Sequence, residues 1–133
     1  MKNIHHFVNG KIFEGESKKT SDVYNPATGE VSAKVTLASK KDVDSVVDSA
    51  HKAFGAWSNT PPLQRARVLF KFKELIEKNY DELTKTVVTE HGKVCNDAKG
   101  SITRGLEVVE FACGIPHLLK GEFTENVGRD VDS

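Results

Sequence analysis

The sequence predicts an α+β fold in which two small β-hairpins, within about residues 6–35, precede about four α-helices. Two observations lead to this prediction. Short strand-like runs separated by turn residues end near Val35, and after Ser39 the apolar residues recur at spacings of three and four, the period of a helix. A typical domain takes ~100–200 residues, so the 133 residues leave little room for a second one.

Two turn segments define the expected hairpins. Asn9-Gly10 suits a type I′ turn because both residues tolerate positive φ angles. In segment 25–30, Pro26 presets φ and Gly29 supplies a positive φ, so the chain can reverse there. The flanking strand-like runs are 7–8 and 11–13 for the first turn, and 22–24 and 31–35 for the second.

Helices are expected over about 40–58, 61–79, 81–91 and 96–119, because each range has an apolar stripe and start or stop signals. The expected N-caps are Ser39 with Asp42 as a capping box, Thr60 before two prolines, Asn79 with Glu82, and Asn96 or Asp97. The first stripe comprises Val43, Val46, Val47, Ala50, Phe54 and Trp57.

Stop signals and glycines shape the last two helices. Gly92 is expected to end the third helix, and Pro116 to kink or end the fourth. Gly100, Gly105 and Gly114 each cost ~1 kcal/mol relative to alanine inside a helix. We therefore expect another backbone or a ligand to approach closely there. The tail after Gly121 shows no helix or strand signal and is expected to be extended.

Composition excludes several classes of protein. Lys plus Arg and Asp plus Glu are both 19, so the net charge is zero and neither nucleic acid nor a membrane is an expected partner. With 38% apolar residues the chain is not expected to be disordered. No signal peptide or membrane span is predicted, which favours the cytoplasm, or the mitochondrial matrix if a transit peptide has been removed.

Few residues suggest chemistry by themselves. His5-His6 should point to opposite faces of a strand, and the segment 90–93 (EHGK) is typical of a helix end with solvated charges. Cys113 lies on an apolar stripe, whereas Cys95 lies near Lys93, which could lower its pKa, but has no recognisable base. No dinucleotide or Walker-type loop is present.

Arg104 is the polar residue with the clearest candidate role. It lies among small residues of the fourth helix, where its guanidinium fork could bind a carboxylate through two hydrogen bonds. A solvated surface arginine is the more common alternative, and the residue pattern alone favours it.

Several motifs together resemble the N-terminal region of the aldehyde dehydrogenase superfamily, in order and in spacing. They are 7–11 (FVNGK), 25–31 (NPATGEV), Ala53-Phe54 with Trp57, 65–69 (RARVL) and 90–93 (EHGK). The segments 104–113 (RGLEVVEFAC) and 118–122 (LLKGE) are similar to the branch of coenzyme-A-dependent methylmalonate-semialdehyde dehydrogenases. The resemblance covers essentially the whole chain.

This resemblance implies that residues 1–133 are an incomplete, N-terminal portion of a Rossmann-like NAD-binding domain. The parent enzyme would oxidise methylmalonate or malonate semialdehyde with NAD and coenzyme A, and would be a homo-oligomer. Its nucleophilic cysteine, its glutamate and its NAD site would follow Ser133. The fragment is therefore expected to be inactive and to bind neither NAD nor coenzyme A.

The resemblance also implies roles for three residues. Arg104 corresponds to the arginine that helps to bind the substrate carboxylate. The backbone carbonyl of Val23 and the side chain of Glu90 correspond to a monovalent-cation site of some members, in which a shorter acid replaces Glu90. The alternative hypothesis for the chain is a stand-alone helical module that only binds a protein partner.

Overall fold

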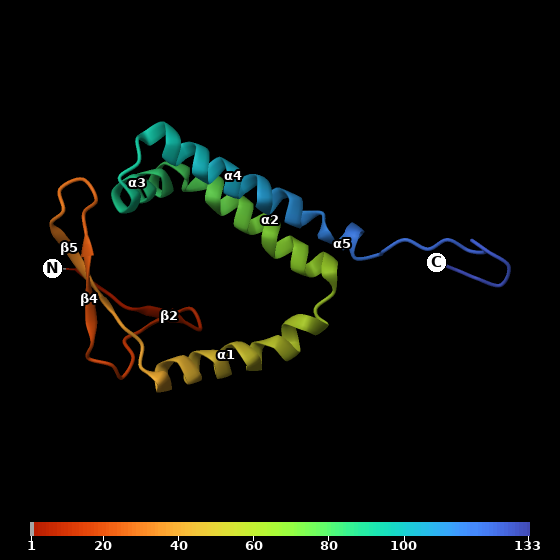
Figure 1. Cartoon of the computed structure of the whole chain (residues 1–133), viewed down its shortest axis with the longest axis horizontal. Coiled ribbons are helices and arrows are strands. Elements are labelled where there is room, and N and C mark those ends of the chain that lie inside the picture. The colour runs from red at the N-terminus through yellow and green to blue at the C-terminus, as the bar shows by residue number, and fades with distance from the viewer. Residues whose placement is uncertain (1) are drawn as a thin grey trace.

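Two small sheets form the N-terminal part of the chain in the computed structural model, which describes residues 2–133 (Figure 1). The strands are β1 (Lys2–Ile4), β2 (His6–Val8), β3 (Lys11–Phe13), β4 (Thr20–Tyr24) and β5 (Val31–Thr36). The helices are α1 (Lys40–Asn59), α2 (Pro62–Lys78), α3 (Tyr80–His91), α4 (Cys95–Cys113) and α5 (Ile115–Leu118). The predicted order of hairpins followed by helices is confirmed.

Both predicted hairpins form. β2 pairs antiparallel with β3, and the turn between them has φ angles of 52° at Asn9 and 73° at Gly10. β4 pairs antiparallel with β5, and their turn is closed by hydrogen bonds from the N–H of Asn25 to the carbonyl of Glu30 and from the N–H of Gly29 to the carbonyl of Asn25. Gly29 has a φ of 74°, the left-handed conformation that favours glycine.

The sequence did not predict β1. This three-residue strand pairs in parallel with β5, with Lys2 opposite Ala33, and so makes a sheet in the order β1-β5-β4. Three residues are too few for a recognisable alternation, and their partner lies about thirty positions away, so no local signal marks the pairing.

The start of α1 is built as predicted. The Ser39 hydroxyl accepts the N–H of Asp42, and the Asp42 carboxylate accepts the N–H of Ser39 at 2.8 Å, which makes a capping box. The same carboxylate accepts the N–H of Glu16 at 2.8 Å, so it ties the preceding loop to the helix. These backbone donors lower the pKa of Asp42 to about 2.

Two predicted N-caps, Thr60 and Asn96 or Asp97, are wrong, whereas Asn79 is the N-cap residue of α3 but its side chain makes no capping hydrogen bond. The Thr60 hydroxyl donates to the carbonyl of Ala56 and so ends α1, and the side chain of Asn79 donates to the carbonyl of Leu75 at the end of α2. α4 begins at Cys95 after the extended residue Val94, so Asn96 and Asp97 lie inside its first turn. Short polar side chains bond to nearby carbonyls as readily as to N–H groups, which makes such signals ambiguous where helices follow each other closely.

The fourth predicted helix is two helices. α4 ends at Cys113, and the N–H of Gly114 turns back to the carbonyl of Phe111. Pro116 then lies in the first turn of α5, where its missing N–H costs no hydrogen bond. A single helix over 96–119 was therefore wrong, because the break occurs two residues before the proline.

Helices α2 and α4 lie side by side, and α3 crosses them at one end (Figure 1). Each of the two long helices buries a small residue, Ala66 in α2 and Ala98 in α4. Leu69 and Leu106 are half-buried between the helices, whereas Phe72 is 50% exposed. The interior of residues 2–133 therefore consists mainly of small side chains.

The apolar stripe of α1 does not face a core within residues 2–133. Phe54 is 65% exposed and Trp57 is 48% exposed, and the valines of the stripe are exposed as well. The helical period of the stripe is confirmed. Of the described chain, only the short β2–β3 hairpin approaches this face, where its residues line open hollows together with Val43, Val46 and Val47.

The tail beyond α5 is not simply extended. The N–H of Thr124 donates to the carbonyl of Ser133 at 2.7 Å, and the N–H of Ser133 donates back to Thr124 at 2.9 Å. The segment 124–133 thus closes into a narrow loop that points away from the helices (Figure 1). Among residues 2–133, no helix has the length and apolarity that a membrane span requires.

Candidate functional site

Arg104 lies on the exposed side of α4, three residues after Ser101. Its guanidinium folds back toward the start of the helix, and its Nη2 atom donates to the Ser101 hydroxyl at 3.4 Å. A Cβ atom placed on Gly100 would lie 3.5 Å from Nη1 of Arg104, an ordinary contact distance. The guanidinium therefore lies over this turn of the helix, and a β-carbon at position 100 would not obstruct it.

Lys93 joins the same cluster from the loop before α4. Its Nζ atom donates to the Ser101 hydroxyl at 3.0 Å, and that hydroxyl donates its own proton to the carbonyl of Asp97 at 3.1 Å. The ion pairs found within residues 2–133 include neither Lys93 nor Arg104. Two cationic side chains thus meet at one neutral oxygen atom.

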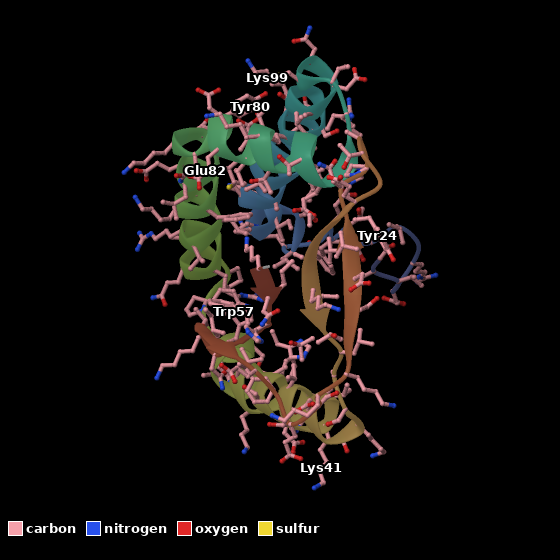
Figure 2. All side chains as sticks on the ribbon, turned by 90° about the vertical axis from the view of Figure 1, so that its left-hand side faces the viewer. Tyr24, Lys41, Trp57, Tyr80, Glu82 and Lys99 are labelled. Atoms are coloured by element: carbon pink, nitrogen blue, oxygen red, sulfur yellow. The ribbon has the colours of Figure 1, made fainter. Side chains whose placement is uncertain are left out.

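Helix α3 fixes the segment of α4 that carries these residues. The Tyr80 hydroxyl donates to the carbonyl of Lys99 at 2.9 Å and hydrogen-bonds with the Thr103 hydroxyl at 3.0 Å, and Figure 2 shows Tyr80 and Lys99 near each other where the two helices meet. Ala98 is fully buried beneath this contact. The turn of α4 that contains Ser101 and Arg104 is therefore fixed against α3 by the hydrogen bonds of Tyr80.

An open apolar groove of about 700 Å³ lies between α2, α3 and α4. Gly105 is part of its wall, and no atom of residues 2–133 lies within 4 Å of a Cβ placed there. The other lining residues are Phe72, Leu75, Ile76, Asn79, Glu82, Leu83, Thr86, Val87, Ile102, Leu106 and Val109. Eight of these eleven residues are apolar, so this groove suits packing against another apolar surface better than acid–base chemistry.

The two cysteines have different environments. Cys95 is exposed at the first position of α4, and Cys113 is buried at its last. Within residues 2–133, no histidine or carboxylate hydrogen-bonds to either thiol. Neither cysteine has the adjacent base that an activated nucleophile requires.

The candidate cation ligands are not joined by any interaction within residues 2–133. The carbonyl of Val23 accepts a hydrogen bond from the Ser32 hydroxyl at 3.0 Å, and the side chain of Glu90 is exposed. The described residues contain no group of three or more acidic, histidine or cysteine side chains arranged to hold a metal ion. The cation site at Val23 and Glu90 stays a prediction.

The helix end after Glu90 does bring two distant segments together. Gly92 ends α3 with a φ of 70°, as expected, and a Cβ placed on it would lie 3.2 Å from the ring of Pro26. Pro26 belongs to the β4–β5 turn. The left-handed glycine thus lets the end of α3 touch the hairpin.

His5 and His6 have separate surroundings. His5 hydrogen-bonds through Nδ1 with the Thr36 hydroxyl at 3.2 Å, whereas the ring of His6 packs near Phe13 with ring centres 6.1 Å apart. The two imidazoles therefore do not converge on one point.

Sequence reasoning missed the link between Lys93 and Ser101. Lys93 was assigned to a set of solvated charges, but it is half-buried and bonded to a hydroxyl eight positions later. No local pattern in the sequence marks this contact. The expected approach of another backbone or a ligand to the glycines of α4 is not found within residues 2–133: Gly100 has only the Arg104 guanidinium of its own helix nearby, and a Cβ placed on Gly105 has no neighbour within 4 Å.

Comparison with known proteins shows which family this chain resembles. Residues 12–132 match the model of the aldehyde dehydrogenase family. The chain is 45% identical over 133 residues to a malonate-semialdehyde dehydrogenase of Pseudomonas aeruginosa. The aligned region covers 100% of this chain and 27% of that relative. A malonate-semialdehyde dehydrogenase of Bacillus pumilus is 42% identical over 130 residues, which are 98% of this chain and 27% of the relative.

Solved structures agree with these relatives. The crystal structure of methylmalonate-semialdehyde dehydrogenase from Oceanimonas doudoroffii has a TM-score of 0.89 and 48% identity, and the match covers 99% of this chain and 27% of that one. A Sinorhizobium meliloti protein assigned as a methylmalonate-semialdehyde dehydrogenase, solved in complex with NAD, has the same TM-score and coverage at 49% identity. The chain thus spans about a quarter of the length of these relatives, and it belongs to the aldehyde dehydrogenase family.

Proposed function

We propose that this chain is the N-terminal portion of the cofactor-binding domain of a longer NAD-dependent enzyme that oxidises malonate or methylmalonate semialdehyde. The observation that supports this most directly is its similarity, along essentially all of its length, to semialdehyde dehydrogenases. A relative solved with NAD supports the choice of cofactor. The substrate is a small molecule, and neither nucleic acid nor a membrane takes part.

The proposed reaction joins an oxidation to acyl transfer. A cysteine thiolate adds to the aldehyde carbon, and NAD accepts the hydride that leaves this carbon, so that a thioester forms. The acyl group would then lose CO2, its α-carbon would take up a proton in place of the carboxylate, and the thiol of coenzyme A would displace the cysteine thiolate to release propionyl-CoA or acetyl-CoA. These steps need a nucleophile, which we place in the remaining part of the longer protein.

The cysteines of this chain do not fit the role of nucleophile. Cys113 is buried, and Cys95 has no base within hydrogen-bonding distance among the described residues. This supports the expectation that residues 1–133 by themselves catalyse no oxidation, and we further propose that they bind neither NAD nor coenzyme A.

Arg104 is the residue of this chain that we assign to substrate binding. A semialdehyde of this class carries a carboxylate at the end opposite to the reacting aldehyde. The planar guanidinium can donate two parallel hydrogen bonds to such a group, which a lysine cannot do. Arg104 is exposed, and its one side-chain hydrogen bond within residues 2–133, to Ser101, is long, so donors remain for a ligand.

Replacing Arg104 by leucine tests this role in the complete enzyme. We expect R104L to raise the KM for malonate semialdehyde at least tenfold, since a hydrogen-bonded charge pair with the substrate is lost. The Kd for NAD should stay near that of the unchanged enzyme, as measured by quenching of protein fluorescence. Equal losses of semialdehyde use and NAD binding would contradict the assignment.

Two further features are proposed for the complete protein. A monovalent cation would bind to the carbonyl of Val23 and the carboxylate of Glu90, and the enzyme would be a homo-oligomer in the cytoplasm. The exposed apolar side chains of α1 and of the groove support an assembly in which further protein surface covers them. A reading frame that continues past Ser133 into further dehydrogenase sequence would exclude the alternative of a stand-alone interaction module.

A further inference from the structure

The cluster of Lys93, Ser101 and Arg104 has an unusual balance of charge. The Ser101 oxygen accepts from Nζ of Lys93 at 3.0 Å and from Nη2 of Arg104 at 3.4 Å. Its proton is directed to the carbonyl of Asp97, so both lone pairs of the hydroxyl face the two cations. A neutral oxygen therefore holds two positive groups together without cancelling either charge.

No acidic side chain of the described segment compensates these charges. Asp97 meets the cluster only through its backbone carbonyl, and neither Lys93 nor Arg104 takes part in an ion pair within residues 2–133. Like charges repel each other at this separation, so an anion that binds between them is favoured. The ammonium of Lys93 and the guanidinium of Arg104 both keep unused N–H donors for such an anion.

We propose that Lys93 and Ser101 are positioning residues for the substrate carboxylate, acting together with Arg104. Ser101 holds the guanidinium over Gly100, and Lys93 fixes the Ser101 hydroxyl while adding a second positive charge beside it. This inference rests on the proposed function and goes beyond it, since it explains how this chain distinguishes a carboxylated aldehyde from a neutral one of the same length.

Lys93 is placed for this role by the end of α3. Gly92, in the left-handed conformation, turns the chain so that Lys93 is half-buried in the loop before α4. From there its side chain reaches Ser101, eight residues later, along the start of the helix. A lysine held in this way loses less conformational freedom on binding an anion than a freely moving one.

The experiment uses the complete enzyme and compares malonate semialdehyde with propanal, which lacks the carboxylate. We expect K93M to raise the KM for malonate semialdehyde about tenfold, because one charge next to the carboxylate is lost, and to leave the KM for propanal unchanged. The kcat for both aldehydes should change little. S101A should raise the same KM in the same direction, and K93R should restore most of the selectivity.

Two controls separate this role from a structural one. K99M removes an exposed lysine of α4, the helix that carries Ser101 and Arg104, and should leave both KM values unchanged. Inhibition by malonate, used as a probe of the carboxylate site, should weaken in K93M by about the same factor as the KM rises. Equal changes of KM for both aldehydes in K93M would show a structural role and overturn the inference.

The outcome for the unchanged enzyme distinguishes this inference from the proposed function. If the unchanged enzyme prefers malonate semialdehyde but K93M keeps the same preference, the inference fails and the proposed function stands. If the unchanged enzyme shows no preference for the carboxylated aldehyde, both fail.

Discussion

Replacing Gly92 by alanine tests the contact through which the end of α3 meets the β4–β5 turn. Gly92 has a φ of 70°, and a Cβ atom there would lie 3.2 Å from Cβ and Cγ of Pro26. The left-handed conformation costs an alanine roughly 1–2 kcal/mol. Crowding against a proline ring adds about 1–3 kcal/mol when neither backbone can move away. We therefore expect G92A to lower the free energy of unfolding by about 2–5 kcal/mol.

Gly29 provides a matched control. Its φ of 74° is nearly the same, but apart from its chain neighbours no atom of residues 2–133 lies within 4 Å of a Cβ placed on it. G29A should therefore lose only the backbone contribution, about 1–2 kcal/mol. The assay is urea unfolding of each variant, followed by circular dichroism at a helix band. Equal losses for G92A and G29A would refute the reasoning, because the contact with Pro26 would then contribute nothing.

Two more predictions concern charge and association. The folded pKa of Asp42, about 2, lies below its ordinary 3.8, so its stabilising effect is complete above pH 3.8 and is lost as the pH falls toward 2. D42N should lower the urea midpoint of unfolding at pH 7, and the midpoint of D42N should fall less than that of the unchanged protein between pH 3.8 and 2. D44N, which removes an exposed ion pair, should change neither the midpoint at pH 7 nor its dependence on pH. An unchanged midpoint in D42N would refute this. Residues 1–133 alone should self-associate because Phe54, Trp57 and Phe72 are exposed, and sedimentation velocity showing a monomer at high concentration would contradict this.

Local signals in the sequence predicted the parts of the fold that depend on neighbouring residues. Asn9-Gly10, the Ser39 capping box and Gly92 all act within four residues, and each forms as expected. Thr60 is not an N-cap, and Asn79 is the N-cap residue of α3 without a capping bond, because both side chains bond to carbonyls of the preceding helix instead. The same local pattern permits both arrangements, so the sequence alone could not choose between them.

Long-range features were not predictable in the same way. The pairing of β1 with β5 joins segments about thirty residues apart, and no alternation within three residues announces it. The stripe on α1 has the period of a buried face, but Phe54 and Trp57 are exposed in residues 2–133. Periodicity shows which side of a helix is apolar and does not show what packs against that side.

The candidate site was predictable only in part. The chemistry of the Arg104 guanidinium suggested that it could bind a carboxylate, and the resemblance to a family implied that this carboxylate belongs to the substrate. The contact between Lys93 and Ser101 depends on the turn at Gly92, which directs the side chain of Lys93 along the start of α4 to a residue eight positions later. Neither helical nor strand spacing pairs residues at that separation, so the contact required a structure.

The most direct test of the account is the substrate preference of the protein made from the complete reading frame that contains this chain. NADH formation is followed at saturating NAD and coenzyme A with either malonate semialdehyde or propanal. We predict that acetyl-CoA and NADH form from malonate semialdehyde with a kcat/KM at least tenfold above that for propanal, since a charge pair with the carboxylate contributes at least this factor. Equal kcat/KM values for the two aldehydes, or no NADH from malonate semialdehyde, would contradict the account.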